Sequence, residues 1–371
     1  MKMKIALIGM VSTHMMRWVN AFAERGHDVT FITCKVATSS QYTYHKNVKI
    51  VMLRFAAPLG YYLNAGQLKR IIKKGKFDVV NVHYASGYGT LARRAKLKGA
   101  LLNVWGSDVY DFPYESAFKM RLIKKNLNYF KRLASTSKCM AMQVKKLVDR
   151  ECSITPFGVD TQVFKPLNIK KSGKIIFGTV KALAPKYGIA DTINAFVMLV
   201  RKLESEGKKK LADNLYYDIY GKVYDDATYD DKLRQLIKQC GMEGRIALRG
   251  FVPNEQLPEI LNGFTLFNCN STCDSESFGV AAVEAMACGI AVQVSDAEGF
   301  AEVVEDKVTG LLSPKGDVEA ICQNMYELLL NSEMREAMGK AGVERVKKLY
   351  DWQSNVDEME KIYTQIVNSG V

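Results

Sequence analysis

The stretch TLFNCNSTCDSESFGVAAVEAMACG, residues 265–289, joins a strand-like segment to a helix-like one through a polar loop. TLFN is short and apolar, whereas VAAVEAMA has the length and the small, apolar composition of a buried helix that ends at Gly289. The first turn of a helix leaves backbone N–H groups without helical partners, and the helix dipole adds partial positive charge there. The stretch therefore predicts half of a βαβ unit with an anion site, suited to a phosphate, at the helix start.

The same alternation of short apolar runs and longer helix-period segments extends along the whole chain, and it is typical of parallel sheets built from βαβ units. The predicted strands are 4–8, 29–33, 48–53, 78–83, 101–105 and 132–136 in the first half, and 175–180, 215–221, 245–250, 265–268, 291–295 and 309–313 in the second. We therefore predict an α/β fold with two Rossmann-like doubly wound domains of about six strands each. Ligand sites lie at the carboxyl ends of such strands, so domains that face each other would share a cleft.

The boundary between the domains is predicted in residues 161–174, which are polar, contain proline and lack periodicity. This gives an N-terminal domain, 1–165, and a C-terminal domain, 166–350. Residues 351–371 are predicted to form a helix with one apolar stripe, which needs a partner surface and is expected to pack back toward the N-terminal domain. The stripe consists of Trp352, Val356, Met359, Tyr363 and Ile366.

The composition is that of an ordinary globular protein, with 48% hydrophobic and 25% charged residues in a chain of 371. No stretch of 18 apolar residues and no signal-peptide pattern is present, so we expect a cytoplasmic protein. Eight cysteines are scattered without a C-x-x-C pair, and the four histidines lie far from the cysteine group near residue 270. These spacings predict reduced thiols and no metal site.

The net charge of +13 is divided unevenly along the chain. Residues 1–165 contain 28 Lys and Arg against 9 Asp and Glu, whereas residues 166–371 contain 24 against 30. The stretch 115–150 is the most basic, with ten cations against Glu115 and Asp149. Such a surface either faces solvent or meets an anionic partner.

Apolar residues recur at helical spacing in the first part of this basic stretch, as in helices that lie on anionic lipid. They are Phe118, Met120, Leu122, Ile123, Leu127, Tyr129 and Phe130. We favour contact with an anionic membrane surface, which would make the protein peripheral on the inner face of the cell membrane; a solvated face is the alternative. A nucleic-acid partner is not expected, because the chain has no zinc finger or aromatic-basic sheet motif.

Two carboxylates, Glu276 and Glu284, lie eight residues apart, one before and one inside the predicted helix. In that position they suit hydrogen bonds from hydroxyls at two points of an extended polyhydroxylated ligand. The alternative is that Glu276 only caps the helix and Glu284 lies on the surface.

Three strings resemble the family 4 glycosyltransferases, which have the GT-B fold, and the resemblance covers nearly the whole chain. The strings are ESFGVAAVEAMACG (276–289), ITPFGVDTQVFKP (154–166) and ERGHDV (24–29). The resemblance implies a retaining, metal-independent enzyme without a cofactor. It would move a sugar from a UDP- or GDP-linked donor to a glycan or lipid-linked acceptor, in cell-surface polysaccharide or glycoconjugate synthesis. A noncatalytic nucleotide-sugar or glycan-binding protein of the same fold is the alternative.

The resemblance also implies roles for residues of the second domain. Glu276 would bind the hydroxyls of the transferred sugar and Glu284 the ribose of the nucleotide. Ser277, Phe278, Gly279 and Gly221 would lie on the donor side, with backbone groups near the sugar or diphosphate. Lys181 and Lys186, in VKALAPKYG, would neutralise the diphosphate, although the family often has arginine at the first position. Glu298 and Gly299 stand where the family commonly has two glycines.

In the first domain, the loop GMVSTH (9–14) lacks the paired glycines frequent in the family. His14 is either an acceptor or phosphate contact or a packed histidine, and the same choice applies to His83. Trp105 follows a strand where the family frequently carries a histidine, so it is expected to stack on a sugar ring. Asp108 either accepts a hydroxyl or organises this loop.

Overall fold

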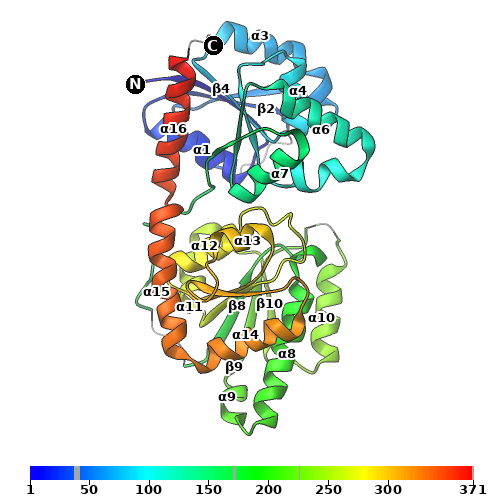
Figure 1. Cartoon of the computed structure of the whole chain (residues 1–371), viewed down its shortest axis with the longest axis vertical. Coiled ribbons are helices and arrows are strands. Elements are labelled where there is room, and N and C mark those ends of the chain that lie inside the picture. The colour runs from blue at the N-terminus through cyan, green and yellow to red at the C-terminus, as the bar shows by residue number, and fades with distance from the viewer. Residues whose placement is uncertain (37–41, 170–172, 225, 370–371) are drawn as a thin grey trace. The chain divides into compact units, whose positions relative to one another are not determined.

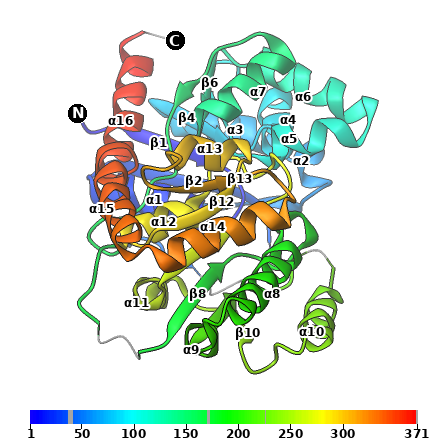
Figure 2. The same ribbon diagram turned by 60° about the horizontal axis from the view of Figure 1, so that its bottom comes forward.

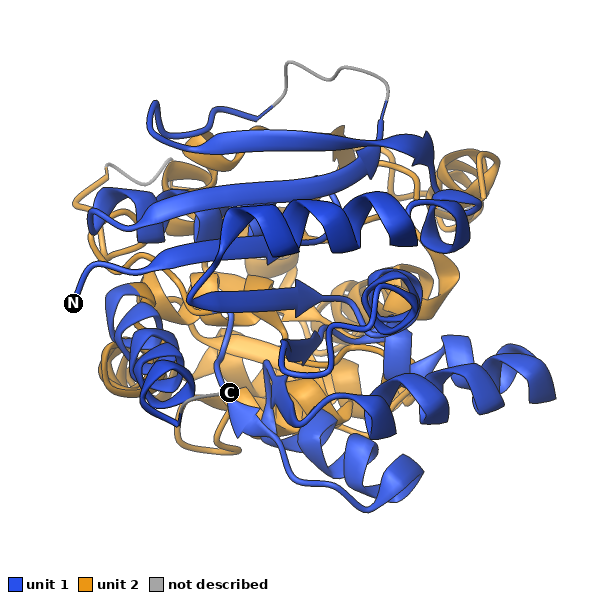
Figure 3. Cartoon of the chain, turned by 90° about the horizontal axis from the view of Figure 1, so that it is seen from above, with its two compact units in different colours: residues 1–157, 353–371 blue, residues 158–352 orange. Residues whose placement is uncertain are grey.

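The computed structural model describes residues 1–36, 42–169, 173–224 and 226–369. The chain forms two compact units, which Figure 3 shows in different colours. Unit 1 consists of Met1–Phe157 and Gln353–Val371, and unit 2 of Gly158–Trp352. The structure thus divides after Phe157, earlier than the predicted boundary.

The predicted linker, 161–174, belongs to unit 2 in the structure, except that residues 170–172 lie outside the described part of the chain. Phe164 is buried, and the Thr161 hydroxyl donates a hydrogen bond of 2.6 Å to the Asp351 carboxylate. Because the segment is polar in composition, the sequence pattern did not predict these contacts with unit 2. The chain therefore changes unit between Phe157 and Gly158.

Unit 1 is built on a parallel sheet of seven strands in the order β3-β2-β1-β4-β5-β6-β7. Its strands are β1 (Lys4–Ile8), β2 (Asp28–Lys35), β3 (Lys49–Ala56), β4 (Val79–His83), β5 (Leu101–Val104), β6 (Arg132–Ser135) and β7 (Ser153–Ile154). Its helices are α1 (Thr13–Glu24), α2 (Gly60–Leu63), α3 (Ala65–Gly75), α4 (Gly87–Arg94), α5 (Ser107–Tyr110), the 3-10 helix η1 (Phe112–Glu115), α6 (Ala117–Tyr129), α7 (Lys138–Val148) and most of α16 (Trp352–Asn368).

Unit 2 is built on a parallel sheet of six strands in the order β10-β9-β8-β11-β12-β13. Its strands are β8 (Ile175–Val180), β9 (Leu215–Tyr220), β10 (Ile246–Gly250), β11 (Leu266–Cys269), β12 (Val292–Ser295) and β13 (Gly310–Ser313). Its helices are η2 (Pro185–Tyr187), α8 (Ile189–Ser205), α9 (Lys209–Asp213), α10 (Tyr229–Gln239), η3 (Asn254–Gln256), α11 (Leu257–Gly263), α12 (Val280–Ala287), α13 (Glu298–Val303), α14 (Val318–Leu330) and α15 (Ser332–Leu349). Helices α8 and α14 lie side by side (Figures 1 and 2), whereas α12 packs with α11, α13 and α15.

The strand order confirms the doubly wound α/β prediction for both units. Every predicted strand is present within a few residues, and β7 is the one strand of the described structure that the sequence pattern did not predict. In each sheet the order reverses beside the first strand, between β1 and β4 in unit 1 and between β8 and β11 in unit 2. Loops at the carboxyl ends of these strands diverge, so each reversal leaves a natural place for a ligand.

Most of helix α16 packs in unit 1 (Figure 1). The stripe residues after Trp352 are buried there. The Tyr363 ring lies 5.0 Å from the Phe22 ring of α1, and the Asn81 amide of β4 donates a hydrogen bond to the Tyr363 hydroxyl. Val356 and Met359 of the same stripe are also buried. The stripe that the sequence left without a partner therefore completes the core of unit 1.

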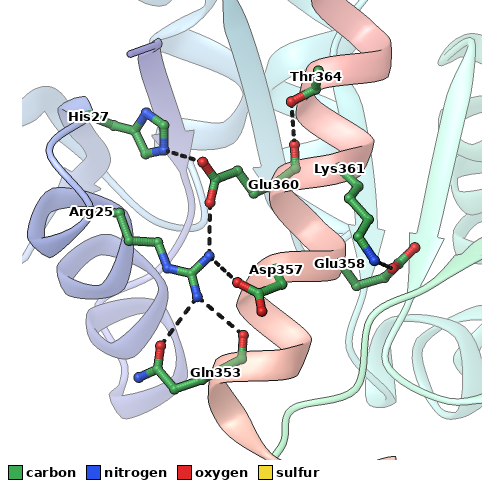
Figure 4. Close-up of polar contacts among 8 residues, drawn as sticks. All are labelled: Arg25, His27, Gln353, Asp357, Glu358, Glu360, Lys361 and Thr364. Carbon is green, nitrogen blue, oxygen red and sulfur yellow. Dashed lines mark hydrogen bonds and ion pairs between the residues drawn. The ribbon is translucent and has the colours of Figure 1, made fainter. Parts of the chain in front are cut away.

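A polar network at the end of α1 holds the same helix (Figure 4). The Arg25 guanidinium pairs with Asp357 at 2.6 Å and Glu360 at 2.8 Å, and it also donates to Gln353. The His27 ring lies 3.1 Å from the other Glu360 oxygen, and its Nδ1 accepts from the Met3 N–H. Because Nδ1 accepts, the proton of a neutral His27 is on Nε2, where it donates to Glu360.

Replacing Arg25 by alanine is expected to lower the free energy of unfolding by about 2 kcal/mol, since hydrogen bonds to charged groups contribute roughly 1.5–3 kcal/mol and these groups are partly exposed. Chemical denaturation monitored by circular dichroism measures the change. Arg70→Ala, an exposed arginine on α3, is the matched control and is expected to stay within about 0.5 kcal/mol of the wild type. Equal losses in both variants would contradict the role of the network.

Candidate active site

The loops after β8 and β11 bring together most of the predicted donor-side residues of unit 2. Lys181 directly follows β8, and Lys186 lies on η2 in the same loop. The loop after β11 carries Glu276, Ser277 and Phe278 and leads into α12. Both loops leave the sheet where its strand order reverses, so the topology explains why segments so far apart in sequence meet.

An ion pair between Lys181 and Glu276 joins the two loops, with the Lys181 ammonium against Oε2 of the carboxylate. Only 16% of the lysine side chain and 8% of the glutamate side chain are exposed. The Ser271 hydroxyl donates to the same oxygen at 3.0 Å. Burial by itself lowers the pKa of Lys181, but the Glu276 charge outweighs it, so the pKa of Lys181 is raised above its ordinary value. The Lys181 side chain is therefore charged at neutral pH.

Tyr187 lies between the two predicted lysines. Lys181 Nζ is 4.5 Å and Lys186 Nζ is 5.4 Å from the centre of its ring, both within the range of a cation–π contact. The Lys186 carbonyl accepts the Thr272 N–H at 2.9 Å, which ties η2 to the β11 loop. Two cations are therefore held at the same edge of the sheet, and both are half-buried.

Helix α12 begins at Gly279, which has φ +88°, a left-handed conformation that disfavours side-chain-bearing residues. No side chain caps this helix start. Glu276 is instead paired with Lys181, so the cap interpretation of Glu276 is wrong. Glu284 lies inside α12 and is buried, so the surface interpretation of Glu284 is wrong as well. The Phe278 ring packs on the Tyr350 ring, with centres 5.5 Å apart.

Close backbone contacts fix the same edge of the sheet. A Cβ atom on Gly221, just after β9, would lie 1.8 Å from the Lys181 carbonyl oxygen, so no larger residue fits there. Gly299 in α13 donates its N–H to the Glu276 carbonyl at 3.0 Å. The structure thus places Gly221 beside Lys181, and Gly299 beside the loop that carries Glu276. Because Gly221 has no side chain, the backbone after β9 can lie close to the loop that carries Lys181.

The predicted residues of unit 1 gather at the carboxyl ends of β1, β4 and β5. The His14 ring on α1 stacks on Phe157, with centres 4.1 Å apart, and its edge meets Trp105 at 6.1 Å. Trp105 also contacts the His83 ring at 5.0 Å and the Phe157 ring at 5.6 Å. These four rings, which we call the aromatic cluster, contact one another although they lie in separate segments of the sequence.

In the aromatic cluster the His83 ring is buried and the His14 ring is half-buried. Burial lowers the pKa of His83 to about 3, and burial together with the Arg17 charge lowers the pKa of His14 to about 4. Neither ring nitrogen of His83 has a hydrogen-bond partner among the described residues. Both rings are therefore neutral at physiological pH.

Asp108 organises the loop after β5 and is fully buried. Its carboxylate accepts the backbone N–H groups of Ala85 at 2.7 Å, Gly106 at 2.9 Å and Trp105 at 3.1 Å. Burial raises the pKa of Asp108, and these hydrogen bonds act in the opposite direction. Of the two interpretations left open, the geometry favours the one in which Asp108 positions Trp105 through the backbone.

The lowered pKa values predict that acid destabilises the protein through the aromatic cluster. Below the unfolded-state pKa of 6.5, the unfolded histidines bind protons that the folded ones do not, so stability falls as the pH drops from 6.5 toward 4. At pH 5 each histidine accounts for ~2 kcal/mol of this loss. Denaturation of His14→Phe at pH 7 and pH 5 is expected to show a correspondingly smaller loss than the wild type. An identical pH dependence would contradict the neutral state of His14.

The basic stretch 115–150 runs from the last residue of η1 through α6, β6 and α7. Ile123, Leu127 and Phe130 enter the core, so the predicted apolar face is largely internal. Phe118 is the exception, because it is 66% exposed. Lys119 pairs with Glu115, and Lys145 pairs with Glu151 at 2.5 Å.

Metal ligands do not gather in the described residues, where no group of three or more His, Cys, Asp or Glu side chains could hold an ion. Over the same described residues, no helix has the length and hydrophobicity to cross a membrane. The cysteines are free thiols. Burial raises the pKa of Cys269, which lies beneath Lys181, to about 12, so it is unsuited to act as a nucleophile.

Three residues of these sites were missed from sequence. Tyr187 and Phe157 lie inside strings already quoted, VKALAPKYG and ITPFGVDTQVFKP, so their position was the available signal. Ser271 lies in the polar loop after β11, and nothing in its neighbourhood distinguished it from the other polar residues there.

Family models match both halves of the chain. The family model described as glycosyl transferases group 1 matches residues 160–345, about half of the chain, and the model described as glycosyl transferase 4-like matches residues 4–137. The chain belongs to the family 4 glycosyltransferases. The expected family is thereby confirmed, and with it the enzyme class of glycosyltransferase.

Relatives of this transferase match it over nearly its full length. N-acetyl-alpha-D-glucosaminyl L-malate synthase of Bacillus anthracis is 25% identical over 369 residues, which cover 93% of this chain and 91% of the relative. Phosphatidyl-myo-inositol mannosyltransferase of Mycolicibacterium smegmatis is 23% identical over 380 residues, which cover 98% of this chain and 92% of the relative.

Solved structures share the fold of this transferase. Sucrose-phosphate synthase of Thermosynechococcus elongatus superposes with a TM-score of 0.84 at 17% identity and covers 100% of both chains. HepE of Anabaena, solved in complex with UDP, gives a TM-score of 0.80 at 15% identity and covers 98% of this chain and 100% of its own. These likenesses confirm the GT-B fold.

Proposed function

We propose that this glycosyltransferase moves a sugar from a UDP- or GDP-linked donor to a glycan or lipid-linked acceptor, with retention of the anomeric configuration and without a metal ion. The observation that carries the proposal is the convergence of Lys181, Lys186, Glu276 and the uncapped start of α12 at one edge of the unit 2 sheet. These groups provide cations, helix-start N–H groups and a hydroxyl acceptor within one loop cluster.

Departure of a nucleoside diphosphate from an anomeric carbon places growing negative charge on phosphate oxygen. The Lys186 ammonium and the amides at the start of α12 are fixed charges and dipoles that stabilise this charge where it develops. Removal of one such donor typically costs about 3 kcal/mol of transition-state stabilisation. Glu276 accepts sugar hydroxyls and Glu284 those of the ribose, so the donor is held at both ends.

Retention without a covalent nucleophile requires that acceptor and leaving group occupy the same face of the sugar. In this proposal the departing phosphate takes the acceptor's proton. Cys269 is buried with a raised pKa, and Glu276 is occupied by Lys181 and Ser271, so neither suits attack on the sugar. The departing phosphate can act as the base, because its oxygen keeps the electron pair of the breaking anomeric C–O bond and can take the proton that the acceptor hydroxyl releases.

The acceptor class rests on the relatives and on the charge of the first domain. Relatives include phosphatidyl-myo-inositol mannosyltransferase and O-antigen chain mannosyltransferase B of Escherichia coli, whose names specify a lipid-linked and a glycan acceptor for those proteins. HepE structures contain UDP and UDP-glucose. We infer a role in cell-surface polysaccharide or glycoconjugate synthesis, at the inner face of the cell membrane, with the basic stretch 115–150 toward anionic lipid.

A nucleotide-sugar screen tests the proposal. The purified protein is expected to show a higher melting temperature with UDP or GDP and to hydrolyse one nucleotide sugar slowly in the presence of EDTA. Proton NMR of the first sugar released or transferred is expected to show the donor's anomeric configuration. An inverted product, or turnover that EDTA abolishes, would overturn the retaining or the metal-free part. Nucleotide binding without any turnover would favour the noncatalytic alternative.

A further inference from the structure

A shallow pocket of about 380 Å³ lies between α4 and α6 of unit 1, away from the carboxyl-edge loops described above. Its lining consists of Arg93, Lys124, Lys125, Asn128 and Tyr129. Three of these five side chains are cations and none is an acid. Helices α4 and α6 pack against each other, as Figures 1 and 2 show.

The orientation of α6 explains why its cations surround the pocket. Ile123, Asn126 and Leu127 face the core, so the opposite face of the helix is left to solvent. Lys124 and Lys125 lie on that exposed face, and within the described part of the chain neither makes an ion pair with a carboxylate. Their charge is therefore directed to a partner outside this chain or to water.

Arg93 is fixed in place at the wall of the pocket. Its Nε donates to the Asn126 side-chain oxygen at 2.7 Å. The Asn126 amide in turn donates to the Ala85 carbonyl at 2.9 Å and to the Thr90 hydroxyl at 2.8 Å. A buried asparagine with all these bonds holds the guanidinium without neutralising it, so its remaining N–H groups can bind an anion.

Exposed apolar side chains also lie on α2 and at the start of α6. Phe118, at the start of α6, is 66% exposed, and Leu63 of α2 is 56% exposed. Tyr62 of α2 is 39% exposed and lies under the Arg94 guanidinium at 5.5 Å. Since α2 packs on α4 and α4 on α6, apolar residues and the cations of the pocket share one helical layer. Such apolar exposure around a charged centre indicates an interaction surface.

We propose that the pocket between α4 and α6 binds the phosphate of an anionic phospholipid headgroup, while Phe118, Leu63 and Tyr62 enter the adjoining interfacial region of the bilayer. Lysines supply point charge and Arg93 supplies directed donors, a combination suited to a phosphate. Aromatic and aliphatic neighbours fit the headgroup–acyl boundary, whereas a nucleic-acid backbone offers them no apolar contact. The proposal rests on the membrane-surface part of the proposed function and assigns it a headgroup site.

Vesicle sedimentation of the full-length protein tests the site. Vesicles of phosphatidylcholine with phosphatidylglycerol are compared with vesicles of phosphatidylcholine with oleate at equal surface charge. We expect tighter binding to the phosphatidylglycerol vesicles, because oleate carries a carboxylate at the interface. The double variant Lys124→Gln/Lys125→Gln is expected to weaken that binding at least ~10-fold, and Phe118→Ser to weaken it as well.

The matched control is Lys209→Gln/Lys210→Gln, which removes the same charge from exposed positions of α9 and is expected to stay within ~2-fold of the wild type. Equal losses in both double variants, or equal binding to both vesicle types, would mean diffuse attraction and overturn the pocket. Inorganic phosphate that raises the melting temperature of the wild type but not of Lys124→Gln/Lys125→Gln, without vesicle binding, would overturn the lipid as its source.

Donor binding separates this proposal from the proposed function. The Lys124→Gln/Lys125→Gln variant is expected to keep the wild-type melting shift with UDP or GDP, since both lysines lie in unit 1, outside the donor-side loops. If no nucleotide binds the wild type while vesicle binding behaves as described, the proposed function fails and the headgroup site stands. If nucleotides bind but vesicles do not, the headgroup site fails alone.

Discussion

Glu276→Gln is expected to lower sugar transfer at least ~100-fold while leaving nucleoside-diphosphate binding in place. A carboxylate that accepts sugar hydroxyls contributes roughly 1.5–3 kcal/mol for each hydrogen bond, and each 1.4 kcal/mol is a factor of ten in rate. Glutamine retains the shape and an acceptor oxygen but loses the charge. Initial rates with saturating donor, together with the melting shift produced by UDP or GDP, measure the two halves of the prediction.

The choice of glutamine follows from the structure. Either substitution leaves the Lys181 ammonium without its partner charge, but alanine would also open a void beside it, and the added instability would be hard to separate from a loss of catalysis. Glu336→Gln on α15, which removes an exposed carboxylate, is the matched control and is expected to transfer at the wild-type rate. Wild-type turnover by Glu276→Gln would remove Glu276 from the reaction. Loss of the nucleotide melting shift would mean that Glu276 acts on the nucleotide or on folding.

The fold was largely predictable because burial in parallel sheets leaves an unmistakable pattern. Strands such as β1 and β12 are buried on both faces, so their sequences are continuous apolar runs between helix-period segments. Strand β7 was missed because a two-residue strand, Ser153–Ile154, is too short to show any period. The boundary after Phe157 was also missed, since it depends on how the following loop packs rather than on composition.

The candidate site was predictable as a set of loops but not as a set of contacts. Topology predicts that the loops after β8 and β11 leave the same edge of the sheet, whereas the roles of Lys181, Lys186 and Glu276 were implied by the family resemblance. That the Lys181 ammonium pairs with Glu276 depends on side-chain geometry across 95 residues of chain, which no local pattern encodes. The spacing of Asp108 could not show that three backbone N–H groups would surround its carboxylate.

The basic stretch shows a further limit of periodicity. Helical spacing identified α6 as amphipathic, but the same apolar residues can face a core or a membrane. The structure assigns Ile123 and Leu127 to the core and leaves Phe118 exposed. Sequence patterns thus identify an amphipathic helix, whereas the neighbours of that helix decide which face remains for a partner.

Lys181→Met is expected to lower the free energy of unfolding by about 3–5 kcal/mol, because it leaves the Glu276 carboxylate buried without its cation. The exposed pair between Lys315 and Asp274, at 2.7 Å on the same edge of the sheet, provides the matched control. About a third of each of those side chains is exposed, so Lys315→Met is expected to cost under ~1 kcal/mol. Chemical denaturation of both variants at pH 7 measures the difference.

A double-mutant cycle separates the pair from ordinary packing loss. The variant Lys181→Met/Glu276→Leu removes both charges, so it is expected to be more stable than the sum of the single losses predicts, by at least ~1.5 kcal/mol. Additive losses would show that the two side chains do not interact and that their contact is incidental.

A coupled pair of Lys181 and Glu276 has a catalytic consequence as well. In the proposed function, donor binding draws Glu276 toward sugar hydroxyls while Lys181 turns to phosphate, so Lys181→Met is expected to lower transfer even at saturating donor.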